Sequence, residues 1–160
     1  MERGFRETPP VAQGNCAYSV RRGSRVRGNR VRGPSLILDT NALSTYVDGV
    51  APSGEILRRQ QCAALPVIVL GAFRYGITGS RHRKVYEEWP RANLSDFEVL
   101  AIPEETTIPY ASLRGVLKKL GRPISANDAW IAALAIQHGL PILSRDERFD
   151  ALPGLHRIGW

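Results

Sequence analysis

The chain has 160 residues, of which 43% are hydrophobic, and it carries a formal net charge of +7. This length is enough to bury one ordinary core and too short to favour two full domains. The longest apolar runs, residues 62–73 and 129–136, are shorter than the roughly 20 residues that a membrane-spanning helix requires, so we expect no membrane anchor.

The positive charge is concentrated at the N-terminus, where residues 1–34 contain eight arginines and two glutamates, a net charge of +6. Residues 35–160 carry 14 basic and 13 acidic side chains and are almost neutral. Residues 1–33 show neither a strand nor a helix period, which predicts a disordered basic extension. This extension is either upstream sequence read from a misassigned start or a basic arm with affinity for phosphates. Two cysteines and no secretory signal favour a cytoplasmic protein.

From residue 35 onward, short apolar runs alternate with helical patterns, which is typical of a parallel sheet in one α/β domain over residues 35–160. We predict strands at 36–38, 67–70, 97–101, 142–143 and 157–158. Helices are predicted at 43–47, 53–64, 73–77, 81–95, 107–120 and 125–138. In this scheme Ser53 caps the second helix and Pro90 kinks or breaks the fourth. The last helix is apolar on nearly every face, so we expect it to be buried and to end at Gly139.

Three carboxylates adjoin these apolar segments. Asp39 directly follows the first strand, Asp146 comes shortly after the fourth, and Asp128 begins the buried helix. Ligands of open parallel sheets bind at the carboxyl ends of the strands, where Asp39 and Asp146 would lie. Grouped carboxylates repel one another unless a cation compensates, and Mg²⁺ and Mn²⁺ prefer such oxygen ligands. The pattern predicts a divalent metal site suited to phosphodiester cleavage.

Each carboxylate also has a purely structural interpretation. Asp39 could be a turn residue, Asp128 could form a capping box with Ser125, and Asp146 could cap the turn before Phe149. A phosphotransferase of the haloacid dehalogenase type also begins with a strand ending in Asp. It needs a second acid at the position of Asn41, so this alternative is disfavoured.

Four segments, in order, resemble the PIN domains, and among them the ribonuclease toxins of bacterial VapBC toxin-antitoxin pairs: residues 36–43, 66–71, 125–133 and 139–146. The resemblance implies a three-layer α/β/α sandwich with a central, mainly parallel sheet. It also implies Mg²⁺-dependent cleavage of RNA, neutralisation by a VapB-like antitoxin in the active-site cleft, and a homodimer. It assigns Asp39, Asp128 and Asp146 as catalytic metal ligands, with Asn41 and Ser144 as supporting hydrogen-bonding groups.

The chain departs from the family pattern at one position. Where the family usually has a glutamate after the second strand, this chain reads Gly71-Ala72-Phe73. Four carboxylates balance two divalent ions, whereas three leave an excess of +1, so we expect one retained ion and weakened or absent cleavage. Candidate replacements for the missing acid are Asp150, Glu87 and Glu88. The alternative is a catalytically inactive PIN-like module that binds RNA or a cognate antitoxin.

Overall fold

A parallel sheet lies at the centre of the computed structural model, which describes residues 33–160. Its strands in this part of the chain are β1 (Ile37–Leu38), β2 (Ala63–Pro66), β3 (Phe97–Leu100), β4 (Ile142–Leu143) and β5 (Arg157–Ile158). Neighbouring strands are all parallel and lie in the order β3-β2-β1-β4-β5. The predicted basic extension at residues 1–33 lies, apart from its last residue, outside the described residues.

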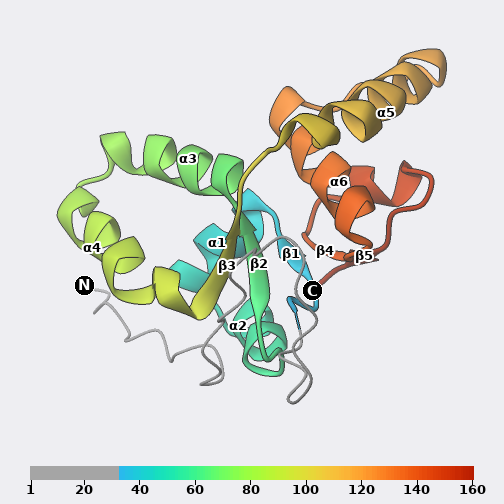
Figure 1. The fold of residues 1–160 in the computed structure, drawn as a ribbon. Helices are drawn as coiled ribbons and strands as arrows, with labels where there is room; N and C mark the ends of the chain where they lie inside the picture. The colour runs from blue at the N-terminus through green and yellow to red at the C-terminus, as the bar shows by residue number, and fades with distance from the viewer. Residues whose placement is uncertain (1–32) are drawn as a thin grey trace.

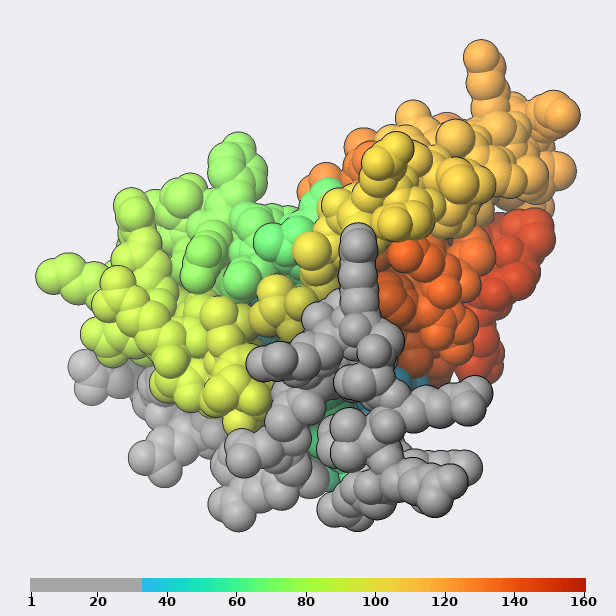
Figure 2. All heavy atoms as spheres, viewed as in Figure 1, coloured from blue at the N-terminus to red at the C-terminus, as the bar shows by residue number. Residues whose placement is uncertain are grey.

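Helices flank this sheet as the outer layers of a three-layer α/β/α sandwich, which confirms the predicted fold class (Figure 1). The helices of the described chain are α1 (Thr40–Val47), α2 (Ala51–Arg58), α3 (Val67–Gly76), α4 (Arg83–Asn93), α5 (Thr107–Lys119) and α6 (Ala126–His138). In the space-filling view, α3 and α4 in green and α5 and α6 in yellow to orange stand on either side of a notch (Figure 2).

The buried helix was predicted correctly. Ser125 caps the N-terminus of α6 by accepting a hydrogen bond from the Asp128 N–H, and Gly139 ends the helix in the left-handed conformation with φ of 64°. Ala129 and residues 131–135 are buried, and the helix packs against α5, α3 and the short turn Glu104–Thr106. Among the described residues, no helix is both long and apolar enough to cross a membrane.

The prediction for the second strand was wrong. Residues 67–70 form the first turn of α3, and the strand is Ala63–Pro66, which the sequence analysis assigned to the end of a helix. The run 62–73 is apolar throughout, so hydrophobicity alone cannot locate the change from strand to helix within it. The β-branched residues after Pro66 favoured a strand, but this preference is weak. Val67 is exposed while Val69, Leu70 and Phe73 are buried, which is the pattern of a helix with one buried face.

Several helix boundaries also differ from the prediction. Helix α1 begins at Thr40, because Asp39 provides the cap, and Ser53 lies inside α2, whose cap is Val50. Helix α4 continues through Pro90 instead of breaking there. Pro90 and its neighbour Trp89 are buried, and this packing offsets the lost backbone hydrogen bond.

Aromatic packing fixes α4 against the rest of the domain. The Trp89 ring lies 6.0 Å from the rings of Tyr46 in α1 and Phe97 in β3, and 6.3 Å from that of Phe73 in α3. Such contacts between tilted or perpendicular rings add to the burial of apolar area. As a result, α4 holds Tyr86 beside the C-terminal end of α1, where its hydroxyl donates to Asp48 at 2.8 Å.

Candidate functional site

The order of the strands locates the site. From β1 the chain proceeds outward through β2 and β3, and it then returns to place β4 on the other side of β1. Ligands of open α/β sheets bind at such a switch point, outside the carboxyl ends of the two strands. Strands β1 and β4 pair in register, Ile37 with Ile142 and Leu38 with Leu143, so the residues that follow them emerge side by side. These residues are Asp39 after β1 and Ser144 after β4.

Asp39 is the most buried acid of the site. It caps α1 and its residue surface is 4% exposed. Its carboxylate accepts hydrogen bonds from the Thr40 backbone N–H at 2.5 Å, the Asn41 Nδ2 at 2.6 Å and the Ser144 Oγ at 2.7 Å. These donors come from two different strand ends and hold the carboxylate in one orientation.

Burial and like charges act together on Asp39. Burial raises the pKa of its carboxyl above the ordinary value, because the charged form has lost water. The hydrogen bonds from Ser144 and Thr40 lower this pKa, whereas the charges of Asp128 and Asp146 raise it further. A cation in the cavity would offset both the burial and the repulsion, and would favour the ionised carboxylate.

Asn41 and Ser144 connect the two strand ends. The Ser144 hydroxyl, which is fully buried, accepts hydrogen bonds from the Asn41 Nδ2 at 3.0 Å and the Asp146 backbone N–H at 2.9 Å. The Asn41 Oδ1 accepts from the Arg145 backbone N–H at 3.1 Å. The structure therefore places both predicted supporting residues against Asp39, and it makes Ser144 the link between Asp39 and Asp146.

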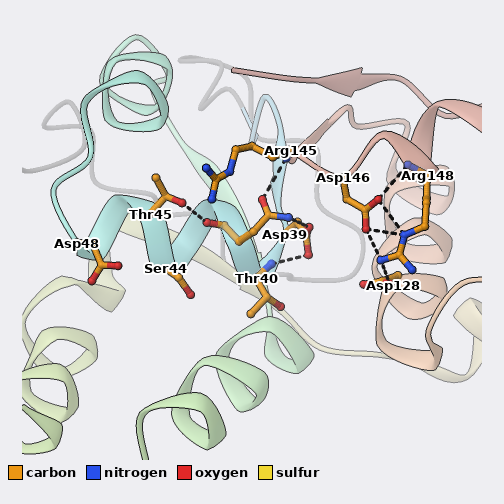
Figure 3. Close-up of a pocket in the computed structure, with 10 residues that line it drawn as sticks. Asp39, Thr40, Ser44, Thr45, Asp48, Asp128, Arg145, Asp146 and Arg148 are labelled. Atoms are coloured by element: carbon orange, nitrogen blue, oxygen red, sulfur yellow. Dashed lines mark hydrogen bonds and ion pairs between the residues drawn. The ribbon is translucent and has the colours of Figure 1, made fainter. Parts of the chain in front are cut away.

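Asp128 and Asp146 lie at one end of the site, and the Arg148 side chain contacts both (Figure 3). The Arg148 Nε donates to both oxygens of Asp146 at 2.9 Å, and its Nη2 also contacts Asp146 Oδ2 and lies 3.5 Å from Asp128 Oδ2. The hydrogen bond from Arg148 holds the pKa of Asp146 below its ordinary value. The structural interpretation of Asp146 also holds, since Asp146 caps the turn Glu147–Ala151 by accepting the Arg148 N–H. At Asp128 the backbone N–H donates to Ser125 Oγ, which is one half of the predicted capping box. Capping and membership of the site thus coexist at Asp146.

A cavity of about 480 Å³ brings these acids together and continues along α1. It is lined by Asp39, Thr40, Asn41, Ser44, Thr45, Asp48, Asp128, Arg145, Asp146 and Arg148. Figure 3 shows Asp39 between Asp48, at the far end of α1, and the cluster of Asp128, Asp146 and Arg148. Asp48 was not predicted as a site residue, because an Asp-Gly pair after a helix is an ordinary way to end it and gives no sign of a cavity.

The candidate replacements for the missing acid do not lie in this cavity. Asp150 pairs with Arg157 through hydrogen bonds of 2.7 and 2.8 Å, and Glu87 pairs with Arg83 at 2.6 Å. Neither these acids nor Glu88 are among the lining residues, and neither is Ala72 in the middle of α3. In this arrangement of the chain Asp150 and Glu87 are held in ion pairs outside the lining, and their role as replacements for the missing carboxylate stays a prediction.

The donor chemistry fits Mg²⁺ better than the present positions of the side chains do. Asp39, Asp128 and Asp146 offer carboxylate oxygens, which hard divalent ions prefer, in one polar cavity. Within residues 33–160, however, no three acidic, histidine or cysteine side chains are grouped closely enough to hold one ion. Arg148 contacts two of the three carboxylates, so an ion that bound both would meet a cation already there.

The chain is similar in sequence to one protein family and to several known proteins. A family model described as the PIN domain matches residues 36–155. Ribonuclease VapC5 of Mycobacterium tuberculosis is 30% identical over 93 residues, which are 57% of this chain and 69% of that protein. Ribonuclease VapC2 of Rickettsia felis is 27% identical over 129 residues, which are 78% of this chain and 96% of that protein.

Solved structures agree with the sequence relatives. VapBC2 from Rickettsia felis, bound to a DNA fragment from its promoter, aligns with a TM-score of 0.71 and 25% identity, covering 78% of this chain and 98% of that chain. VapBC-5 from Mycobacterium tuberculosis, from the VapBC family of toxin-antitoxin systems, aligns with a TM-score of 0.62 and 28% identity, covering 78% of this chain and 100% of that chain.

Proposed function

The chain belongs to the PIN domain family, and from this premise we propose that it is a Mg²⁺-dependent endoribonuclease of the VapC toxin type. The observation that supports this most strongly is the meeting of Asp39, Asp128 and Asp146 in one cavity at the switch point of the sheet. These three aspartates would hold Mg²⁺, and Mn²⁺ would serve in its place. The relatives of this chain named VapC are named as ribonucleases.

The residues of the site have separate tasks in this proposal. Asp39 is the fixed ligand, since the Asn41 amide and the Ser144 hydroxyl hold its carboxylate in place. Asp128 and Asp146 complete the negative end of the cavity. When bound, Mg²⁺ would supply a Lewis acid that stabilises the charge developing on the oxygens of the RNA phosphodiester. Arg145, which also lines the cavity, would contribute positive charge for the RNA backbone.

In this proposal Ala72 weakens RNA cleavage, because it supplies no carboxylate to the metal site. Three carboxylates carry −3, which is more than enough for one divalent ion but leaves two ions with an excess of +1, so one ion is retained and RNA cleavage is slow. The nearest additional acid of the cavity, Asp48, lies beyond the far end of α1 and is engaged by the Tyr86 hydroxyl. It does not take the position of the missing glutamate.

The test restores the acid. Cleavage of RNA in Mg²⁺ is compared for the wild-type chain, Ala72→Glu and the uncharged control Ala72→Gln; both residues are good helix formers, so α3 tolerates them equally. We expect faster cleavage by Ala72→Glu than by the wild type or by Ala72→Gln. Wild-type cleavage as fast as that of Ala72→Glu would refute the weakening. If no variant cleaves any RNA tested, the alternative of an inactive module that binds RNA or an antitoxin replaces the enzyme.

We also propose a VapB-like antitoxin as the partner and a homodimer as the assembly. The antitoxin is supported by VapBC-5 of Mycobacterium tuberculosis, from the VapBC family of toxin-antitoxin systems, and by VapBC2 of Rickettsia felis, whose structures resemble this chain. The homodimer rests on the family resemblance alone. Coexpression with the product of a small neighbouring reading frame, followed by size-exclusion chromatography with light scattering, tests both points. A monomer that forms no complex would contradict them.

A further inference from the structure

Arg148 occupies a position that the proposed function does not explain. Its guanidinium makes a two-pronged contact with Asp146 and reaches Asp128, so one side chain bridges two of the three proposed metal ligands (Figure 3). The carboxylates are mostly covered, with 18% and 21% of the side chains of Asp128 and Asp146 exposed, whereas the Arg148 side chain is 59% exposed. The guanidinium therefore approaches the acids from the solvent side.

The contact is not needed to build the turn. The Arg148 backbone N–H already donates to Asp146 Oδ1 at 3.0 Å, and this bond caps the turn Glu147–Ala151. Any residue except proline at position 148 could provide that bond. The side chain adds a positive charge at the place where two carboxylates face the cavity.

The net charge of the site also bears on the role of Arg148. Asp39, Asp128 and Asp146 carry −3 when ionised, and Arg148 reduces this to −2, the charge that one divalent ion would balance. The guanidinium and a metal ion are both cations that require the same carboxylate oxygens, so they compete for them. The planar guanidinium of arginine matches the two oxygens of a carboxylate in shape as well as in charge. It has to move away before those oxygens can bind a metal ion.

Arg145 provides a contrast within the same cavity. It lines the cavity as Arg148 does, yet its guanidinium lies over the Trp160 ring, 5.6 Å from the ring centroid. Within the described part of the chain it forms no ion pair with the three aspartates. The two arginines thus contribute the same charge to the cavity and differ in their contact with the acids.

We propose that the Arg148 guanidinium is a built-in cation that competes with the divalent ion for Asp128 and Asp146, so that metal loading requires its release. This inference rests on the metal site of the proposed function. It makes the metal-free protein a stable resting form in which the two acids are already paired. Metal affinity is then set in part by the strength of the contact with Arg148.

The experiment is a calorimetric titration of MgCl₂ into the full chain at constant ionic strength. It uses the wild type, Arg148→Gln, Arg148→Lys and the charge-matched control Arg145→Gln. We expect the Kd for Mg²⁺ to fall about fivefold in Arg148→Gln, the equivalent of one good, partly exposed ion pair. The Arg148→Lys variant keeps the positive charge but cannot donate two parallel hydrogen bonds to one carboxylate. Its affinity for Mg²⁺ should therefore lie between those of the wild type and Arg148→Gln. Arg145→Gln should change the Kd less than Arg148→Gln does.

Several outcomes separate this inference from the proposed function. If the wild type binds Mg²⁺ and Arg148→Gln binds it no more tightly, the competition is refuted and the metal site stands. An equal gain in Arg145→Gln would mean that only net charge matters, which also refutes the competition. Absence of binding in the wild type and in every variant would refute the metal site itself. Thermal unfolding with and without MgCl₂ checks that each variant folds and gives a second measure of binding.

Discussion

Replacing Ser144 by alanine is the sharpest test of how the site is organised. The buried hydroxyl uses its full hydrogen-bonding capacity, donating to Asp39 Oδ2 and accepting from the Asn41 amide and the Asp146 N–H. Ser144→Ala removes one donor to Asp39, the side-chain acceptor of the Asp146 N–H and one of the two acceptors of the Asn41 amide. The two strand ends then lose their central link while the backbone of the sheet stays in place.

The size of the effect follows from these contacts. A hydrogen bond to a charged group contributes roughly 1.5–3 kcal/mol, and Asp39 keeps its two other donors, so we expect a loss of about 2 kcal/mol in the free energy of unfolding. For a domain of this size the corresponding fall in Tm is about 4–8 °C.

The variant should also change the pH dependence. Because the hydrogen bond from Ser144 lowers the pKa of Asp39, its loss raises that pKa further. A carboxyl with a raised folded-state pKa costs stability while it is ionised, and this cost is relieved as pH falls through the folded pKa. The destabilisation by Ser144→Ala should therefore be larger at neutral pH than below the folded pKa of Asp39. Binding of Mg²⁺ should be lost at a higher pH than in the wild type.

The matched control is Ser53→Ala. Ser53 is also fully buried, but within residues 33–160 its hydroxyl makes one long hydrogen bond, of 3.4 Å to the Val50 carbonyl, and Ser53 does not line the cavity. Urea unfolding at several pH values is measured for both variants and the wild type. If Ser144→Ala loses no more stability than Ser53→Ala, or if its loss is independent of pH, the link between Ser144 and the charge on Asp39 is refuted.

Two further predictions concern the surroundings of the site. Asp150→Asn should leave the Kd for Mg²⁺ unchanged, because Asp150 pairs with Arg157 outside the cavity; a weaker Kd would restore it as a ligand. Asp48→Asn should lower the pKa of Tyr86, which is raised mainly by its hydrogen bond to Asp48, and ultraviolet titration of the phenol measures this. The stability that this raised pKa provides below the unfolded pKa is lost as pH rises through the folded value, and in the variant this loss should be smaller and complete at a lower pH. If the pKa of the Tyr86 phenol is the same in the variant and in the wild type, the hydrogen bond to Asp48 is contradicted.

Much of the fold was predictable because patterns of burial and capping are local. The apolar residues before Asp39 and the apolar faces of the helix ending at Gly139 are visible in the sequence, and both elements lie where they were predicted. The strand Ala63–Pro66 was not predictable in this way. It shares one continuous apolar run with α3, and only packing in three dimensions decides where the strand ends and the helix begins.

The site also has a part that the sequence predicts and a part that it does not. The strand-end positions of Asp39 and Asp146 follow from the topology of a parallel sheet, and the sequence was sufficient to predict them. The contacts of Arg148 and the place of Asp48 in the cavity depend on the direction of side chains from a short turn and a helix end. No spacing in the sequence specifies those directions.

The most direct test of the metal site is a calorimetric titration of MgCl₂ into the wild type, Asp39→Asn and the control Asp48→Asn, each checked for folding by circular dichroism. Asp39 and Asp48 line the same cavity, and both variants remove one negative charge from it. We predict one bound ion for the wild type and for Asp48→Asn, and loss of that binding in Asp39→Asn. Binding by Asp39→Asn as tight as that of the wild type would remove Asp39 from the site and contradict the proposed metal centre.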